Sequence, residues 1–165
     1  MKHLIVLFFL FIVSTGNSQN LFPDKCVGVW QGTMKIYSRG VLRDSVKVTF
    51  TVKKSDKPNE WMWGTEYHSE KMPMTKDYVL KLKDAEKHIY VTDENNGIEL
   101  QDYLFGNKLY SVFETQGIFL TSSYELRNNE LIFEVTSGKR IDPNGQEVTN
   151  YTVDNLQRVV LKRSK

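Results

Sequence analysis

The chain has 165 residues, of which 22 are Lys or Arg and 20 are Asp or Glu, so its formal net charge is +2 at pH 7. Both signs are interspersed along the chain, which leaves no electrostatic basis for nucleic-acid binding. The only cysteine is Cys26. A single cysteine cannot form an internal disulfide, so core burial and strand pairing must stabilise the fold. We expect the Cys26 thiol to be buried.

The N-terminus predicts an export signal. Lys2 provides a short positive start, residues 4–13 form an unbroken apolar run, and residues 14–18 become small and polar. The run is about half as long as a membrane-spanning helix, and no later segment approaches the roughly 18 apolar residues that a span requires. We therefore expect a signal peptide at residues 1–18. A single mature domain at residues 19–165 is then secreted or periplasmic, with no membrane span.

Short strands and turn-forming residues alternate from Cys26 onward. Val46, Val48 and Phe50 alternate with polar residues, which is the period-two pattern of a strand with one apolar face. The preceding segment around Trp30 has the same pattern, and Arg39-Gly40 predicts a tight hairpin between the two. Further strands are predicted at about residues 61–68, 75–83, 88–93, 98–104, 108–114, 118–126, 130–136 and 151–162.

The connections between these strands are short, and Asn96-Gly97 is the sharpest hairpin signal. No segment has the sustained period of a long helix. A sequential antiparallel sheet avoids exposed edges by closing on itself or by folding into two layers. The pattern therefore predicts an all-β fold, an antiparallel up-and-down barrel of about 8–10 strands without a major helix, with a two-layer sandwich as the alternative.

The first predicted strand reads Gly-Val-Trp-Gln-Gly at residues 28–32. A Gly-x-Trp on the opening strand of an up-and-down barrel resembles the lipocalins and the wider calycin superfamily. The resemblance implies that Trp30 closes one end of the barrel and that Arg158, on the final strand, packs across it. The usual disulfide and extra helices are not predicted, so the chain is most similar to the helix-free, lipocalin-like barrels of uncharacterised bacterial secreted proteins. Alternatively, Trp30 is an ordinary core residue of an unrelated barrel.

The sequence contains no recognisable catalytic centre. It has no Gly-rich phosphate loop, paired-cysteine zinc site or nucleophile elbow, so we expect neither an enzyme nor a cofactor or metal site. His68 lies on the polar phase of its strand beside Glu66, and His88 follows a charged turn. A metal or haem site at His68 and Glu66 is a weaker alternative. The acidic residues at 93–99 do not match the spacing of a calcium loop, and we interpret them as a solvated hairpin.

Aromatic side chains dominate the predicted interior. The aromatic residues on the apolar phase of their strands are Trp30, Trp61, Trp63, Tyr67, Tyr78, Phe113, Tyr124 and Phe133. Four polar residues share that phase, namely Thr65, Lys76, Ser111 and Ser122. Large apolar walls with a few hydroxyl groups are typical of a small-molecule pocket.

The sequence therefore favours a secreted lipocalin-like barrel that binds a small, largely apolar molecule non-covalently. Ser122 would orient the ligand. The predicted ligand-binding residues are Trp61, Trp63, Tyr67, Tyr78, Phe113, Ser122 and Tyr124.

A filled barrel is the alternative. The protein would then be a secreted interaction or inhibitor protein that contacts an unknown protein partner through hairpin loops near residues 95–97 and 143–145. An internal cavity of roughly 300 Å³ or more favours the ligand-binding interpretation over this one.

Overall fold

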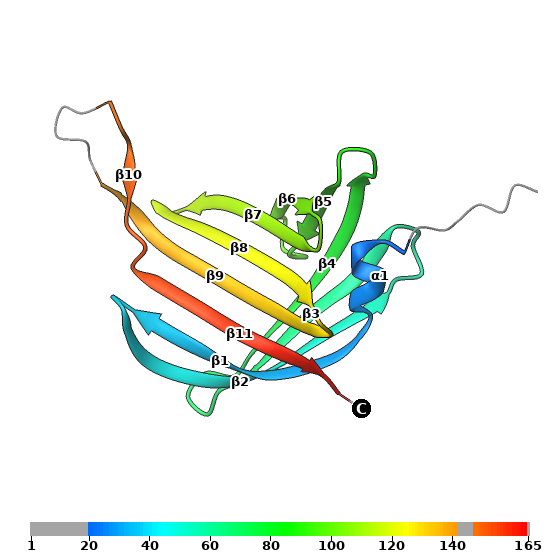
Figure 1. Ribbon diagram of the computed structural model, residues 1–165, viewed down its shortest axis with the longest axis horizontal. Coiled ribbons are helices and arrows are strands. Elements are labelled where there is room, and N and C mark those ends of the chain that lie inside the picture. The colour runs from blue at the N-terminus through cyan, green and yellow to red at the C-terminus, as the bar shows by residue number, and fades with distance from the viewer. Residues whose placement is uncertain (1–19, 142–146, 165) are drawn as a thin grey trace, which may run out of the picture.

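The computed structural model describes residues 20–141 and 147–164. Its elements are, in chain order, α1 (Phe22–Cys26), β1 (Gly28–Ser38), β2 (Val41–Lys54), β3 (Glu60–His68), β4 (Met74–Asp84), β5 (Ile89–Asp93), β6 (Glu99–Phe105), β7 (Lys108–Thr115), β8 (Ile118–Arg127), β9 (Glu130–Ile141), β10 (Asn150–Tyr151) and β11 (Asn155–Arg163) (Figure 1). The signal predicted at residues 1–18 and the turn predicted at 143–145 lie outside the described residues.

The sheet closes on itself through hydrogen bonds. The strands are ordered β9-β11-β1-β2-β3-β4-β5-β6-β7-β8, and β8 pairs back with β9, which makes an antiparallel ring of ten strands in the described part of the chain. The short β10 pairs with the far end of β9. The expected all-β, up-and-down barrel is confirmed, and the sandwich alternative is wrong. The only helix in the described ranges is α1, which has five residues.

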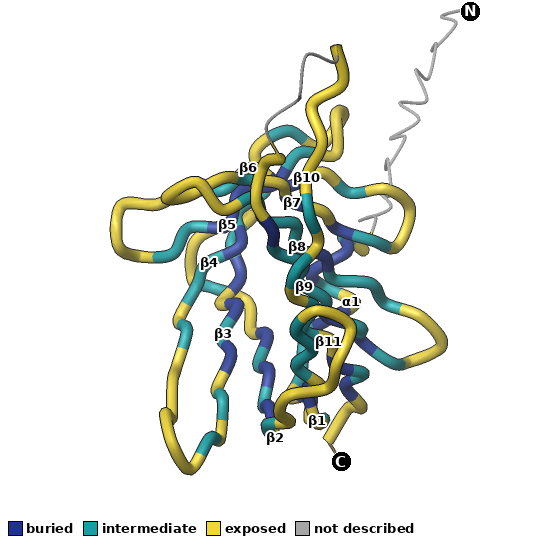
Figure 2. The backbone as a smooth tube through the Cα atoms, turned by 90° about the vertical axis from the view of Figure 1, so that its left-hand side faces the viewer, coloured by how far each residue is buried: buried dark blue, intermediate teal, exposed yellow. Residues whose placement is uncertain are grey.

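Alternation of apolar and polar residues produces the strands, as the pattern predicts. In β3, the buried residues Trp61, Trp63 and Thr65 alternate with the exposed residues Met62 and Glu66. Figure 2 shows this alternation along β3 and shows exposed residues gathered in the connecting turns. The inward side chains therefore form one continuous interior.

Residues with a left-handed backbone conformation form the turns. Arg39 and Gly40 have φ values of 50° and 75° and join β1 to β2 directly, because Ser38 pairs with Val41. This is the tight hairpin expected there. The connection at residues 94–98 also lies at its expected place, although it is a five-residue loop rather than a two-residue turn.

The predicted final strand is interrupted where β10 passes into β11. The Thr152 hydroxyl accepts a hydrogen bond from the Lys139 backbone N–H at 2.8 Å and lies 3.3 Å from the Lys139 carbonyl oxygen. Gly138 allows this close approach, because a Cβ there would overlap the Thr152 carbonyl group. β10 and β11 thus form one interrupted partner strand along β9.

Helix α1 lies at the end of the barrel opposite β10 (Figure 1). Its residues Phe22 and Cys26 are 4% and 0% exposed and pack into the core. Burial raises the pKa of the Cys26 thiol to about 12, so the thiol stays protonated and unreactive. The expectation of a buried cysteine is confirmed. The helix itself was not predicted, because a single turn contains too few residues to show a helical period.

The arginine that packs across Trp30 is Arg163, not Arg158. The Arg163 guanidinium lies 4.2 Å from the centre of the Trp30 ring, and it also donates hydrogen bonds to the carbonyls of Lys25, at 3.0 Å, and Val27. Trp30 pairs directly with Arg163 across β1 and β11. Arg158 is on the opposite face of β11, where it forms an exposed ion pair with Glu134 at 3.2 Å.

Candidate functional site

The barrel interior has a packed end and a hollow end. Near α1, the side chains of Phe50 and Trp63 are each 1% exposed and meet edge to face, with ring centres 5.0 Å apart. Beyond them lies a cavity of about 330 Å³. Its lining residues come from β3 to β9, β11 and the β5–β6 loop: Thr65, Tyr67, Met74, Lys76, Tyr78, Thr92, Glu94, Leu100, Asp102, Ser111, Phe113, Leu120, Ser122, Tyr124, Phe133, Val135 and Gln157.

Five of the seven predicted ligand-binding residues border this cavity: Tyr67, Tyr78, Phe113, Ser122 and Tyr124. They come from four strands, β3, β4, β7 and β8. Burial raises the pKa of Tyr67 to about 12 and also raises the pKa of Tyr124, so both phenols stay neutral at ordinary pH. Each of these two tyrosines therefore presents an apolar ring and one neutral hydroxyl group.

Trp61 and Trp63 point inward as predicted, but they do not border the cavity. Trp63 packs edge-on against Tyr124, with ring centres 5.2 Å apart, and belongs to the packed end. The indole N–H of Trp61 donates to the Asp24 carboxylate of α1 at 3.0 Å. Both were assigned to the ligand site because strand phase shows which face a residue occupies but not its depth along the barrel.

A stripe of polar side chains crosses one wall of the cavity. Asp102 on β6 lies directly opposite Ser111 on β7, and Ser111 lies directly opposite Ser122 on β8. On the other side of Asp102, the Thr92 hydroxyl donates to its carboxylate at 2.7 Å. The register and this hydrogen bond place three hydroxyl groups and one carboxyl group in one polar stripe of an otherwise largely apolar cavity.

Asp102 is the most unusual residue of this stripe, because its side chain borders the cavity while the residue is only 4% exposed. Burial raises the pKa of the Asp102 carboxyl to about 6, although hydrogen bonds from Thr92 and Ser111 oppose the shift. Sequence reasoning missed this residue. Its signal was present, since Asp102 shares the inward phase of its strand with Leu100 and Leu104.

No Lys, Arg or His among residues 20–141 and 147–164 forms an ion pair with Asp102. Lys76 also borders the cavity, but its ammonium group lies over the ring of Tyr78, 5.6 Å from its centre. Glu94 is the remaining charged residue of the lining.

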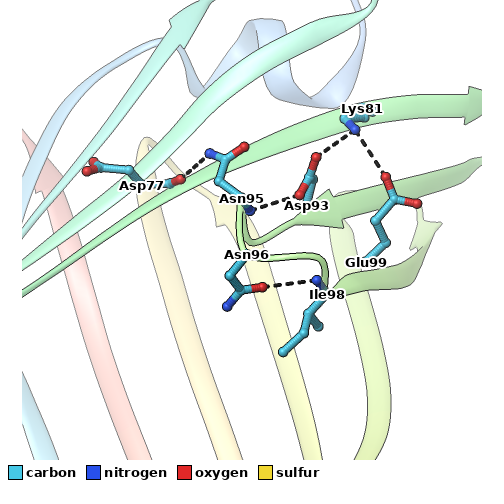
Figure 3. Close-up of polar contacts among 7 residues, drawn as sticks. All are labelled: Asp77, Lys81, Asp93, Asn95, Asn96, Ile98 and Glu99. Atoms are coloured by element: carbon cyan, nitrogen blue, oxygen red, sulfur yellow. Dashed lines mark hydrogen bonds and ion pairs between the residues drawn. The ribbon is translucent and has the colours of Figure 1, made fainter.

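The β5–β6 loop that carries Glu94 is held against β4 by its own polar groups (Figure 3). The Asn95 backbone N–H donates to the Asp93 carboxylate at 2.8 Å, and the Asn95 side chain donates to the Asp77 carbonyl at 2.6 Å. Asn95 has a φ of 56°, a left-handed conformation that asparagine tolerates better than most residues. This part of the cavity rim is therefore a braced loop.

Two acidic residues of this hairpin form ion pairs with a lysine. Lys81 lies 2.7 Å from Asp93 and 3.1 Å from Glu99 (Figure 3). Throughout the described ranges, no group of three or more His, Cys, Asp or Glu side chains is placed to hold a metal ion.

The two histidines within the described residues, His68 and His88, lie outside the barrel interior. His68 is exposed, and its Nε2 lies 2.8 Å from the Thr49 hydroxyl oxygen. His88 is exposed in the turn before β5. The expectation that His68 faces outward is confirmed.

No helix within residues 20–141 and 147–164 is long and apolar enough to cross a membrane.

Sequence comparison matches this chain to no protein-family model and to no curated protein. Solved structures do match. The S-type phycobiliprotein lyase CPES from Guillardia theta has a TM-score of 0.64 at 9% identity, over 87% of this chain and 91% of the lyase. A protein of unknown function of the DUF3598 family from Nostoc punctiforme has a TM-score of 0.60 at 15% identity, over 86% of this chain and 49% of that one. The fluorescent protein UnaG has a TM-score of 0.48 at 14% identity.

At these identities the likeness is one of fold. Together with the closed antiparallel ring, it shows that this protein has the same kind of β-barrel fold as these structures.

Proposed function

We propose that the protein binds a small, largely apolar molecule non-covalently in the hollow end of its barrel. The cavity of about 330 Å³ carries this proposal. Its size lies at the lower end of the range of about 300–1,000 Å³ that small-molecule sites occupy. Apolar side chains such as Phe113, Leu120 and Val135 form most of its walls, and one polar stripe can orient a ligand.

The lining favours binding without chemical conversion. Nucleophilic catalysis needs a hydroxyl or thiol within reach of a base, and that base is usually oriented by a third group. No His or Cys is among the described residues that line this cavity, and the hydroxyls of Thr92 and Ser111 both hydrogen-bond to a single carboxyl, Asp102. One structure with this fold is a phycobiliprotein lyase, so the fold itself is compatible with catalysis. The proposal therefore rests on the residues of this cavity.

The hollow interior also favours ligand binding over the alternative of a filled scaffold that contacts a protein partner through its loops. A filled lumen is the premise of that alternative, and the described residues line a cavity instead.

We further propose that the protein is exported, with residues 1–18 as the signal and the barrel as the mature secreted or periplasmic protein. The support is the charged start and apolar run of the sequence. Expression in a bacterial host, followed by mass measurement of the purified protein, should give a chain that begins at Gln19. A chain of full mass would contradict export.

Filling the cavity tests the binding function. Leu120 borders the cavity, and Leu120→Trp places a large ring in it. Val112 is 58% exposed, so Val112→Trp adds the same ring outside the barrel and is the matched control. We expect the neutral dye Nile red to bind the wild-type protein and Val112→Trp with similar affinity, and Leu120→Trp at least about tenfold more weakly. Circular dichroism verifies folding, and equal binding by all three proteins would contradict the proposal.

A further inference from the structure

We infer that the ligand of this cavity is an organic cation, an apolar molecule that carries a protonated amine, and that the Asp102 carboxylate receives the ammonium group. This inference rests on the proposed binding function and narrows it to one class of ligand.

The position of Asp102 is the first support. The residue is 4% exposed, and its side chain faces the cavity. Its position is set by the register of β6 with β7 and by the Thr92 hydroxyl at 2.7 Å. A buried, oriented carboxyl on the wall of an apolar cavity is placed to meet a ligand.

The absence of a countercharge is the second support. A buried carboxylate is costly unless it is paired, and no cationic side chain pairs with Asp102 in the described part of the chain. Lys76, the cation of the lining, has its ammonium group over Tyr78 instead. A ligand ammonium would supply the missing positive charge, whereas a ligand carboxylate would place a second negative charge beside the first.

The remaining walls suit both parts of such a ligand. Aromatic faces attract cations and also bury apolar chains. The cavity is lined by five aromatic rings; the Lys76 ammonium already lies over Tyr78, and Tyr124 stacks with Phe50 and Phe133. The rings of Tyr67 and Phe113 are the other two.

A protonated primary amine has three N–H donors and no acceptor. The carboxylate of Asp102 and the hydroxyl of Ser111, directly across the strand pair, are acceptors at one level of the wall. The hydroxyl of Ser122 continues this row. The polar stripe therefore matches an ammonium head group, and the apolar walls match the body to which it is attached.

Three probes with the same apolar chain test this inference: octylamine, octanol and octanoic acid, titrated by calorimetry at about pH 8, where the first is a cation and the last an anion. We expect octylamine to bind the wild-type protein at least about tenfold more tightly than either of the others. Equal affinities for amine and acid, or tighter binding of the acid, would overturn the inference but leave the binding function standing. Failure of all three probes and of Nile red to bind would overturn both.

The variant Asp102→Asn keeps the shape of the side chain and removes its charge. We expect it to weaken octylamine binding about tenfold and to leave octanol binding unchanged. Asp56→Asn, in the exposed β2–β3 connection, is the matched control and should bind like the wild-type protein. Unchanged octylamine affinity in Asp102→Asn would overturn the inference. The comparison of probes on the wild-type protein does not depend on how either variant folds.

The pH dependence is a further readout. Octylamine affinity should fall as the pH drops below about 6, because protonation removes the Asp102 charge, and octanol affinity should not. The other titratable groups that border the cavity or pack beside Asp102 are Tyr67, Tyr78, Tyr90, Tyr124, Lys76 and Glu94. A pH step that persists in Asp102→Asn would assign the effect to one of these groups and overturn the inference.

Discussion

At the end of the barrel near α1, Trp30, Phe50 and Trp63 are at most 1% exposed and fill the space between the strands. At the other end, side chains of the same kinds, including Phe113 and Tyr124, surround a cavity of about 330 Å³. Both groups follow the same inward alternation. The difference shows that alternation determines which residues point inward, whereas the helix and the register of the strands determine where the interior is filled.

The largest expected effect comes from truncating matched leucines at the two ends. Leu131 is 0% exposed in the packed core, and Leu120 borders the cavity. We expect Leu131→Ala to lower the free energy of unfolding by about 2–5 kcal/mol, because it creates a new void in a close-packed region. Leu120→Ala should cost about 1 kcal/mol or less, since its side chain already has empty space on one side. Urea unfolding measures both, and equal losses would contradict the division into packed and hollow ends.

The next effect concerns the stability of the unliganded hollow end. The pKa of Asp102 rises from 3.8 to about 6 on folding, so the folded protein binds more protons than the unfolded chain between those values. Stability therefore falls as the pH rises from about 4 to about 6 and remains lower above that range. We expect Asp102→Asn to stabilise the free protein by up to about 3 kcal/mol at pH 8 and by nothing at pH 3.

Thermal unfolding of the wild-type protein and Asp102→Asn across this pH range makes that measurement. A difference between the two proteins that does not vary with pH would show that the carboxyl is not desolvated in the folded state. A pH-dependent difference would show that the hollow end of the free protein retains a charge that costs stability.

The smallest of the three effects distinguishes the two arginines of β11. Arg163 stacks on Trp30 and donates to two backbone carbonyls of the α1 region, so we expect Arg163→Ala to cost about 1–2 kcal/mol. Arg158 forms a single exposed ion pair with Glu134, so Arg158→Ala should cost about 0.5 kcal/mol or less. Urea unfolding under identical conditions compares the two. A greater loss in Arg158→Ala would restore Arg158 as the closing residue.

Sequence reasoning placed five of its seven predicted ligand-binding residues correctly at the candidate site. Tyr67, Tyr78, Phe113, Ser122 and Tyr124 were predicted from strand phase, and the structure places all five around the cavity. Whether they bind a ligand stays a prediction. Trp61 and Trp63 were included in error, because period-two alternation carries no information on depth. Asp102 was missed because an isolated acid within an apolar phase is easily taken for a change of phase.

The sequence by itself determined the antiparallel strands, the tight Arg39-Gly40 turn and the inward and outward faces, because these depend on local alternation and on residues that accept left-handed geometry. Only the tertiary structure decided that β8 pairs with β9 to close the ring, that Arg163 covers Trp30, and that Asp102, Ser111 and Ser122 lie in one row. These features depend on register between strands that are distant in sequence or offset along the barrel. A shift of two residues in the register between two strands would leave each side chain on the same face of the sheet but would change its cross-strand neighbours.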